Sequence, residues 1–384
     1  MRKIIARMDI PLFITMLIFI VLGLVMVYSA SSIAAVVRYG YEPYHFFIRQ
    51  AIFVVFALIA GIIVLKIPTK AYQALSWPLM LILIALLIYV LFFGDIHNSA
   101  RSWIDLKFFS IQPSEFAKSI IIMFSAVYYN NLHYNKVKNI YAYFFPLAIT
   151  IVIFGLVYKQ PDLGSALIIA GISFMMFISI PDVLENKGKV FKILGVDLII
   201  FVLVFLLLGK SLLNGMQSNR FNFQNPCSRY TESSGYQVCN GFIAINNGDL
   251  FGVGLGHSTQ KYLYLPESHT DFIFPIIVEE LGLITGTLVI IGYAFILYRI
   301  LKIAKNSENL RCSVLAYGTF WYFTAHIIIN LMGVMALIPL TGVPLPLLSY
   351  GGSFTINAIV MLFVVERVCI ENKINKTKRE IKAL

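Results

Sequence analysis

Residues 261–282 read KYLYLPESHTDFIFPIIVEELG, and this stretch decides how the chain is interpreted. A short polar cluster stands directly before a run that is apolar and long enough to cross a membrane: Glu267, His269, Thr270 and Asp271. A bare carboxylate at the boundary of a bilayer is costly unless it is solvated, paired or used in chemistry. Asp271 is therefore a candidate functional residue. The alternative is that Asp271 or Thr270 caps the helix that follows.

The composition indicates an integral membrane protein. Of 384 residues, 59% are hydrophobic and 13% are charged, and the mean hydropathy is +0.82. A soluble domain is about half apolar and a quarter charged. We therefore expect one all-α domain embedded in the bilayer over residues 1–384, instead of the two or three soluble domains that the length suggests. The net charge of +11 does not indicate nucleic-acid binding, because the basic residues fall between apolar spans and form no stripe.

Apolar runs of about 19 residues predict ten transmembrane helices. The predicted spans cover approximately residues 10–30, 48–66, 75–94, 114–130, 141–158, 163–181, 192–209, 272–298, 313–337 and 352–370. An even number of spans places both termini on one side of the membrane. That side, which includes the basic tail 371–384, carries 20 of the 30 Lys and Arg residues, so we expect it to be cytoplasmic.

The loops on the opposite face carry most of the information about function. The largest runs from about 210 to 270, and loops of this length are usually functional or disordered. Its apolar residues, such as Phe242 and the stretch 263–265, favour a folded segment that dips partly into the membrane. The other outer segments that carry charge, amide or glycine are 98–118, 159–166 and 339–353. We expect the Gly- and Pro-rich segment 339–353 to break its helix and line a cavity.

The four cysteines fit this topology. Cys227 and Cys239 both fall in the 210–270 loop, on the face where disulfides persist, so a disulfide between them is predicted. The alternative is two unrelated thiols. Cys312 and Cys369 fall at cytoplasmic helix ends, where thiols stay reduced. The sequence contains no Cys/His arrangement with zinc spacing, and we predict no site in which the protein alone holds a metal.

Six motifs occur in order over nearly the whole chain. They are VMVYSASS (25–32), RSWIDLKFFSIQPSEFAK (101–118), KQPDLGSA (159–166), GYQVCNGFIAINNGDLFGVGLGHSTQKYLYLPESHTDFIF (235–274), EELG (279–282) and PLLSYGGS (346–353). Together they resemble the SEDS family (shape, elongation, division and sporulation), which includes FtsW, RodA and SpoVE. Within the family, GVGLGHSTQKYLYLPE resembles the FtsW/SpoVE branch more than the RodA branch.

The resemblance implies a glycosyltransferase of peptidoglycan synthesis, acting in cell division or cell-shape wall synthesis. Such proteins polymerise lipid II, a disaccharide-pentapeptide on undecaprenyl pyrophosphate, at the outer face of the bacterial cytoplasmic membrane. The implied partners are a class B penicillin-binding protein, which crosslinks the strands, and divisome or elongasome proteins. The family's acid in the HTDF motif corresponds to Asp271, which is the implied general base. The sequence leaves open whether a divalent cation, Mg²⁺ or Mn²⁺, bridges the pyrophosphate and one carboxylate.

This chemistry requires a base for the acceptor hydroxyl and cationic or amide groups for the departing pyrophosphate. The candidate substrate-binding residues are Arg49, Arg101, Glu115, Lys118, Asp162, Gln237, Lys261, Glu267, His269, Thr270 and Ser349. Several have a structural alternative. Glu115 and Lys118 are three residues apart and can pair with each other. Arg49 can anchor a helix end, and Asp162 can cap the sixth helix.

Two pairs of polar residues fall inside predicted spans. Glu279 and Glu280 lie two to three turns inside the eighth span, so we expect at least one to pair with a cation or face a wet cavity. His326 and Asn330 share one helix face, and an interhelical hydrogen bond is the expected role of that face.

Two other classes of function compete with the enzyme. Ten helices, intramembrane acids and broken segments also describe a lipid II flippase or transporter. A noncatalytic scaffold that recruits the division machinery is the third class, and its basic tail could make such contacts. The absence of an inverted repeat in the sequence and the crowding of polar motifs at one surface favour the glycosyltransferase.

Overall fold

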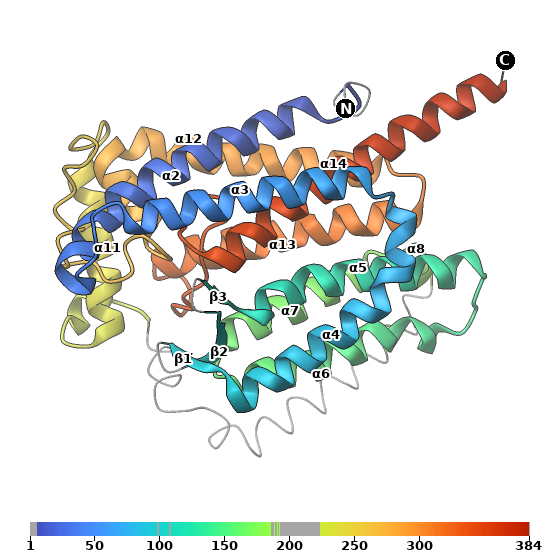
Figure 1. The fold of residues 1–384 in the computed structure, drawn as a ribbon, viewed down its shortest axis with the longest axis horizontal. Coiled ribbons are helices and arrows are strands. Elements are labelled where there is room, and N and C mark those ends of the chain that lie inside the picture. Colours follow the sequence, from blue (N-terminus) through green and yellow to red (C-terminus); the bar gives the residue numbers. More distant parts are fainter. Residues whose placement is uncertain are drawn as a thin grey trace.

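The computed structural model describes residues 6–97, 100–106, 109–185 and 223–383, together with residues 188, 190 and 192. Most of its helices run along one common direction (Figure 1). The α-helices are α2 (Ile10–Tyr39), α3 (His45–Lys66), α4 (Tyr72–Phe93), α5 (Pro113–Tyr134), α6 (Phe145–Tyr158), α7 (Leu163–Ile178), α8 (Pro181–Glu185), α11 (Ser233–Gly248), α12 (Ile273–Lys305), α13 (Leu310–Val334) and α14 (Gly352–Ala383). Short 3₁₀ helices cover Thr69–Ala71, Ile140–Phe144 and Pro226–Arg229.

Seven helices in the described part of the chain are long and apolar enough to cross a membrane. They are Ile10–Tyr39, His45–Lys66, Thr69–Phe93, Ile140–Tyr158, Ile273–Lys305, Leu310–Val334 and Gly352–Lys382. The prediction of an all-helical, multi-pass membrane protein is confirmed at this level. Two further predicted spans fall on α5 and α7. The predicted span 192–209 and residues 210–222 of the predicted loop lie outside the described residues, apart from residue 192.

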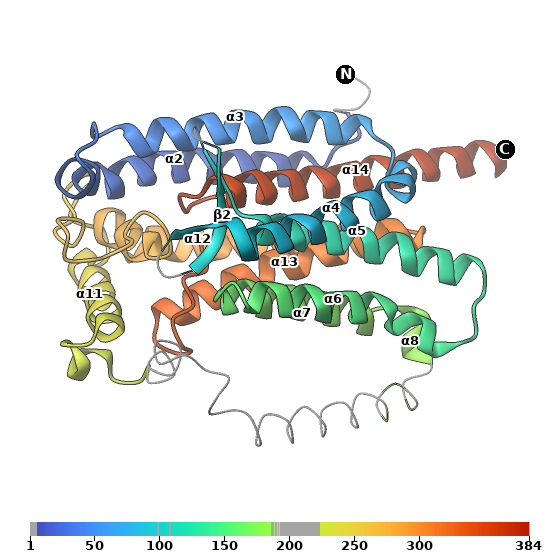
Figure 2. The same cartoon turned by 60° about the horizontal axis from the view of Figure 1, so that its bottom comes forward.

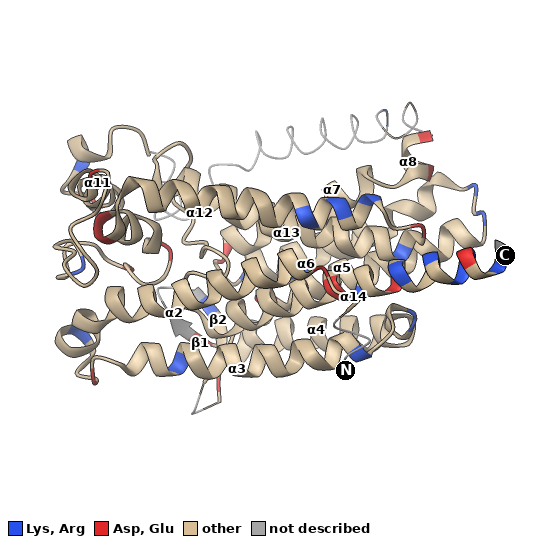
Figure 3. Ribbon diagram, turned by 90° about the horizontal axis from the view of Figure 1, so that it is seen from above, with Lys and Arg blue, Asp and Glu red and all other residues tan. Residues whose placement is uncertain are grey.

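The bundle has two different ends (Figure 1). The described chain begins and finishes at the same end, which we call the terminal end. The other end, the loop end, holds α11 and residues 40–44, 249–272 and 339–351. Lys and Arg are concentrated toward the terminal end, around the ends of α12 and α14 (Figure 3). The predicted asymmetry of basic charge is therefore present in the folded chain.

Two hydrophobic clusters fill the bundle. The larger joins α2, α3, α12, α13 and α14, and the smaller joins α4, α5, α6 and α7. Helix α5 contributes to both, with Ile122 and Ala126 in the larger cluster and Ala117 and Ile121 in the smaller. The polar first turns of α5 are thereby enclosed between the two halves of the bundle.

The structure corrects two predicted boundaries and one predicted loop. α2 continues to Tyr39, and α14 continues to Ala383, so the predicted tail 371–384 is largely helical. No Gly or Pro interrupts the sequence from residue 354 onward, so nothing local ends α14 near residue 370. The described residues of segment 98–118, expected as a loop in an all-α fold, contribute two strands to a small three-stranded antiparallel sheet and the start of α5. The strands of the sheet are β1 (Asp95–His97), β2 (Ala100–Asp105) and β3 (Ser110–Ile111).

The described part of the large predicted loop, from residue 223 onward, is folded. Helix α11 runs across the direction of the bundle at the loop end (Figure 2). Cys227 and Cys239 form the predicted disulfide, which joins the turn Pro226–Arg229 to α11, while Cys312 and Cys369 are free and buried. The bond therefore fixes the turn Pro226–Arg229 against α11 at the loop end.

Candidate functional site

Asp271 lies at the loop end, just before α12, and is 7% exposed. The N-cap residue of α12 is Phe272, which corrects the alternative that Thr270 or Asp271 occupies the capping position. The Thr270 hydroxyl lies 3.1 Å from Asp271 Oδ1 and 2.9 Å from Glu267 Oε2. Three members of the predicted polar cluster, Glu267, Thr270 and Asp271, are therefore connected through the Thr270 hydroxyl.

Two other segments fix the backbone around Asp271. Asn330 of α13 donates from Nδ2 to the carbonyls of Asp271 and Val343, each at 2.8 Å. Both acceptors lie outside helices; the interhelical hydrogen bond expected of the His326–Asn330 face is made by His326 with Lys118 of α5. Gly342 has φ +71°, and a Cβ built on it would lie 3.9 Å from Asp271 Oδ2. The carboxylate thus faces a glycine of the 339–353 segment, which interrupts the helices as predicted and is buried over residues 345–349.

His269 is buried against two aromatic rings. Its ring centroid lies 4.8 Å from that of Phe46 and 5.6 Å from that of Tyr350, and its carbonyl accepts the Tyr350 amide at 2.9 Å. Burial lowers the pKa of His269 to about 4, although the nearby Glu267 carboxylate acts in the opposite direction. The imidazole is neutral at pH 7, so His269 cannot serve there as a cation for pyrophosphate.

A second polar group lies between α5 and α13. Lys118 Nζ is 2.7 Å from Glu115 Oε1 and 3.1 Å from His326 Nε2, and all three side chains are buried. The predicted Glu115–Lys118 pair is confirmed. An ammonium only donates, so His326 accepts at Nε2 and carries its proton on Nδ1. Glu115 Oε2 and His326 Nδ1 have no hydrogen-bond partner among the described atoms.

His326 is the member of this group that the sequence analysis did not place in the site. The signal available was its position four residues before Asn330, because such residues lie one above the other on a helix face. Asn330 holds the Asp271 backbone and His326 holds Lys118. One face of α13 therefore contacts both the Asp271 backbone carbonyl and the buried cation.

Three other candidates make structural contacts. Asp162 is the N-cap of α7, accepts the Ser165 amide at 3.0 Å, and so has the predicted capping role. Ser349 Oγ accepts the Leu345 amide, which makes its hydroxyl part of the turn. Gln237 donates from α11 to the Pro266 carbonyl at 3.1 Å.

Both buried acids of α12, Glu279 and Glu280, have hydrogen-bond partners. Glu280 pairs with Lys261 at 2.9 Å, as expected for at least one of these acids. Lys261 is therefore enclosed and has a protein partner, and its predicted role in substrate binding stays a prediction. Glu279 accepts hydrogen bonds from Thr259 and from Asn247.

Arg49 and Arg101 lie at the surface. Arg101, on β2, donates to the Phe92 carbonyl at 3.4 Å, and its side chain is exposed. Arg49 is also exposed, near the start of α3. Neither guanidinium is part of the buried groups around Asp271 and Lys118. Their predicted roles in substrate binding depend on a substrate that reaches the surface of the loop end.

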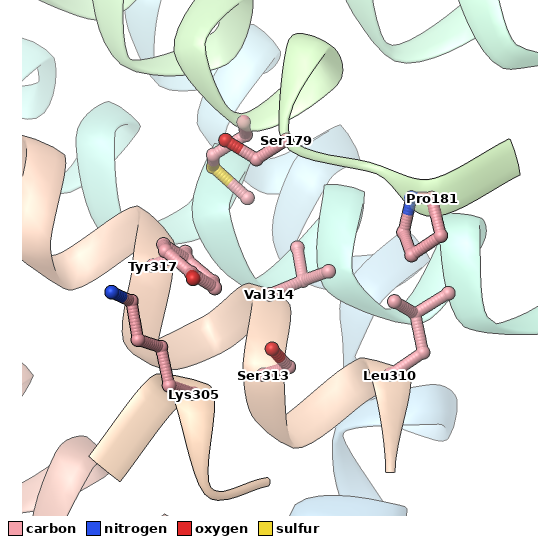
Figure 4. Close-up of a pocket in the computed structure, with 8 residues that line it drawn as sticks. Ser179, Pro181, Lys305, Leu310, Ser313, Val314 and Tyr317 are labelled. Atoms are coloured by element: carbon pink, nitrogen blue, oxygen red, sulfur yellow. The ribbon is translucent and has the colours of Figure 1, made fainter. Parts of the chain in front are cut away.

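A cavity of about 260 Å³ lies at the terminal end, between the ends of α7 and α12 and the start of α13. Figure 4 shows Lys305, Ser313 and Tyr317 around it. Asp271 precedes the start of α12, whereas Lys305 is its last residue, and 33 helical residues span about 50 Å. The cavity is therefore remote from Asp271.

The described residues contain no group of three or more His, Cys, Asp or Glu side chains placed to hold a metal ion. A divalent cation would consequently need oxygen ligands from a bound substrate in addition to those of the chain.

Comparisons with known proteins agree with the sequence motifs. A family model, FtsW/RodA/SpoVE, described as "Cell cycle protein", matches residues 10–374. The chain is 36% identical to the "Probable peptidoglycan glycosyltransferase FtsW" of Bacillus subtilis, over 99% of this chain and 95% of the relative. It is 35% identical to "Stage V sporulation protein E" of the same organism, over 90% of this chain and 92% of that protein.

Solved structures share the fold. A chain from a study of the coordination of polymerization and crosslinking by a peptidoglycan synthase complex aligns with a TM-score of 0.74 and 22% identity, covering 95% of this chain and 98% of that one. The crystal structure of RodA, a rod shape determining protein of Thermus thermophilus, aligns with a TM-score of 0.66 and 24% identity. The alignment covers 94% of this chain and 96% of RodA. At 22% and 24% identity, these alignments show a shared fold.

Proposed function

This chain is a peptidoglycan glycosyltransferase of the FtsW/RodA/SpoVE family, to which it belongs over nearly its whole length, and we propose that it polymerises lipid II at the outer face of the bacterial cytoplasmic membrane. The observation that carries the proposal is Asp271, a buried carboxylate opposite Gly342 at the loop end. Asp271 is the general base: it takes the proton of an acceptor sugar hydroxyl while that oxygen bonds to the anomeric carbon of the donor.

The bond that breaks joins the donor's anomeric carbon to its lipid pyrophosphate, which departs as an anion. Lys118 is the cation that stabilises this leaving group, since it is buried, charged and connected to Asp271 through α13. Glu115 holds Lys118 through one oxygen and keeps the other for a substrate hydroxyl or amide. Arg101 and Arg49 guide the charged lipid head group at the surface.

The loop end faces the outside of the cell in this proposal, and the terminal end faces the cytoplasm. The support is the concentration of Lys and Arg toward the terminal end and the disulfide at the loop end. The partner is a class B penicillin-binding protein that crosslinks the strands, working with divisome or elongasome proteins. A divalent cation, where one is used, would be held by a carboxylate of the chain together with substrate oxygens, and it would supply positive charge for the departing pyrophosphate.

Reconstitution in lipid vesicles tests the activity and separates the three classes of function. Purified protein with labelled lipid II should yield glycan polymer, resolved by gel electrophoresis, and release undecaprenyl pyrophosphate in equal measure. Movement of lipid II between leaflets without polymer would indicate a flippase instead. If a folded preparation supplied with the class B partner gave no polymer and no movement of lipid II, the protein would be a scaffold.

A further inference from the structure

Helix α12 is broken near its start, and the break is filled by another segment. Gly282 has φ 85° and ψ 165°, so the helical hydrogen bonds stop there. The amides of Val253 and Gly254 donate to the Glu279 and Glu280 carbonyls at 2.9 and 3.0 Å. On the other side of the break, the Leu283 and Ile284 amides donate to the carbonyls of residues 249 and 250. Residues 273–281 are therefore a separate half-helix, clamped by the segment 249–254.

The clamp leaves no room for a side chain at its centre. A Cβ at Gly282 would lie 2.2 Å from the Leu250 carbonyl oxygen, and one at Gly252 would lie 2.3 Å from that of Glu280. Both contacts are with backbone, which cannot move aside as a flexible side chain does. The half-helix and the segment 249–254 therefore form one rigid unit.

A buried ion pair ties the next segment to the same half-helix. Lys261 and Glu280 are 3% and 0% exposed, and their charged atoms are 2.9 Å apart. Ser29 of α2 donates to Glu280 at 2.6–2.7 Å and lies 3.2 Å from the Lys261 ammonium. The Ser258 amide also approaches Glu280, at 3.4 Å. The pair is thus satisfied by hydrogen bonds and anchored to α2.

The ion pair joins two residues that stand on either side of Asp271 in the sequence. Lys261 and Glu280 are 19 positions apart, and Asp271 lies near the middle of the segment they enclose. Four further hydrogen bonds hold the middle of that segment: Ser268 donates to the Ala30 carbonyl, and the carbonyls of residues 266, 269 and 271 accept from Gln237, Tyr350 and Asn330. Joining the two ends of the segment limits how far the Asp271 carboxylate can move.

We propose that the Lys261–Glu280 pair, anchored by Ser29, positions Asp271 for the acceptor hydroxyl, an inference that rests on the proposed function of Asp271 as the base. The pair does not touch substrate; it holds the segment that carries the reacting carboxylate. Loss of the pair should lower kcat with little change in KM, because a displacement of about 1 Å at a reacting group costs on the order of 100-fold in rate.

Lys261→Met keeps the length of the side chain and removes its charge. We expect kcat for lipid II polymerisation to fall roughly 10- to 100-fold while KM changes less than about threefold. Lys261→Arg, which restores the pair with Glu280, should recover most of the loss. Lys302→Met, at the exposed far end of α12, is the matched control and should retain wild-type kinetics.

Ser29→Ala is the second variant, should Lys261→Met fail to fold. It removes the hydrogen bonds that the Ser29 hydroxyl makes with Glu280 and Lys261 and leaves the ion pair, so folding should persist while kcat falls roughly two- to tenfold. Asp271→Asn in the same assay separates the two proposals. If it is inactive while the Lys261 and Ser29 variants keep wild-type kcat, or only raise KM, the positioning role is wrong. Wild-type turnover by Asp271→Asn would show instead that the proposed base is wrong.

Discussion

Two buried Lys–Glu pairs lie toward the loop end of this protein, and they differ in how fully they are satisfied. Glu280 accepts hydrogen bonds from Lys261 and Ser29, with the Ser258 amide nearby. Glu115 bonds Lys118 through one oxygen, and its other oxygen has no partner among the described atoms. A saturated buried pair holds structure together, whereas an unsatisfied polar atom is costly unless a ligand completes it. This difference is the basis on which we propose a positioning role for the first pair and a substrate-binding role for the second.

The largest effect on the rate of polymerisation is expected from a substitution of Asp271, the proposed base. Asp271→Asn keeps the shape of the side chain and removes its basicity, so polymerisation should fall about 10²–10⁴-fold. The thermal unfolding temperature should stay close to that of the wild type, because the amide can keep the contact with Thr270. Turnover near the wild-type rate in a folded preparation would refute the assignment of the base.

The second effect sharpens the contrast between the two pairs. Lys118→Gln should lower kcat/KM for lipid II roughly 10- to 100-fold, because a hydrogen bond to a charged group is worth about 1.5–3 kcal/mol. A rise in KM should accompany the loss, unlike the pure kcat effect expected at Lys261. The double variant Lys118→Met/Glu115→Met controls for folding, since it leaves no carboxylate buried alone. If the Lys118 and Lys261 variants changed kcat and KM in the same way, the proposed difference in role between the two pairs would be wrong.

The third effect concerns the stability of the loop end in acid. The pKa of His269 lies at about 4 in the folded protein, below the value of about 6.5 in an unfolded chain. The unfolded state therefore binds the proton first, and stability is lost as the pH falls from about 6.5 to about 4. The loss should reach roughly 3 kcal/mol.

Thermal unfolding in detergent at several pH values measures this loss. His269→Phe should flatten the acid dependence, because it keeps the contacts with Phe46 and Tyr350 but binds no proton. His257→Gln, at an exposed position of the same end, is the matched control and should keep the wild-type dependence. An unchanged dependence in His269→Phe would mean that other groups cause the acid sensitivity.

The smallest effect is expected at the surface. Arg101→Gln should lower kcat/KM for lipid II about two- to fivefold, because an exposed cation attracts the pyrophosphate through screened electrostatics. The loss should shrink as salt is raised, whereas the loss at buried Lys118 should persist. Lys302→Gln at the terminal end should have no effect. Equal, small effects at Arg101, Lys118 and Lys302 would indicate that all three only anchor helices.

The sequence alone was sufficient for features that depend on composition or on short spacing. Long apolar runs identify the membrane class and the helices, because a span of about 20 apolar residues is what a bilayer requires. The Glu115–Lys118 pair follows from a spacing of three residues on a helix, and the Asp162 cap from its place before α7. The Cys227–Cys239 bond follows from two cysteines in one loop.

Only the tertiary structure decided which distant residues meet. Ser29 and Glu280 are 251 positions apart, and Lys118 and His326 are 208 apart, so no local pattern joins them. In a soluble helix an apolar stripe shows which face is buried. In a membrane the lipid-facing side is as apolar as the buried side, so hydropathy identifies the span but not its inward face. Likewise, only the fold shows that Lys261, a candidate substrate-binding residue in the sequence, pairs with Glu280 of α12 beside Ser29 of α2.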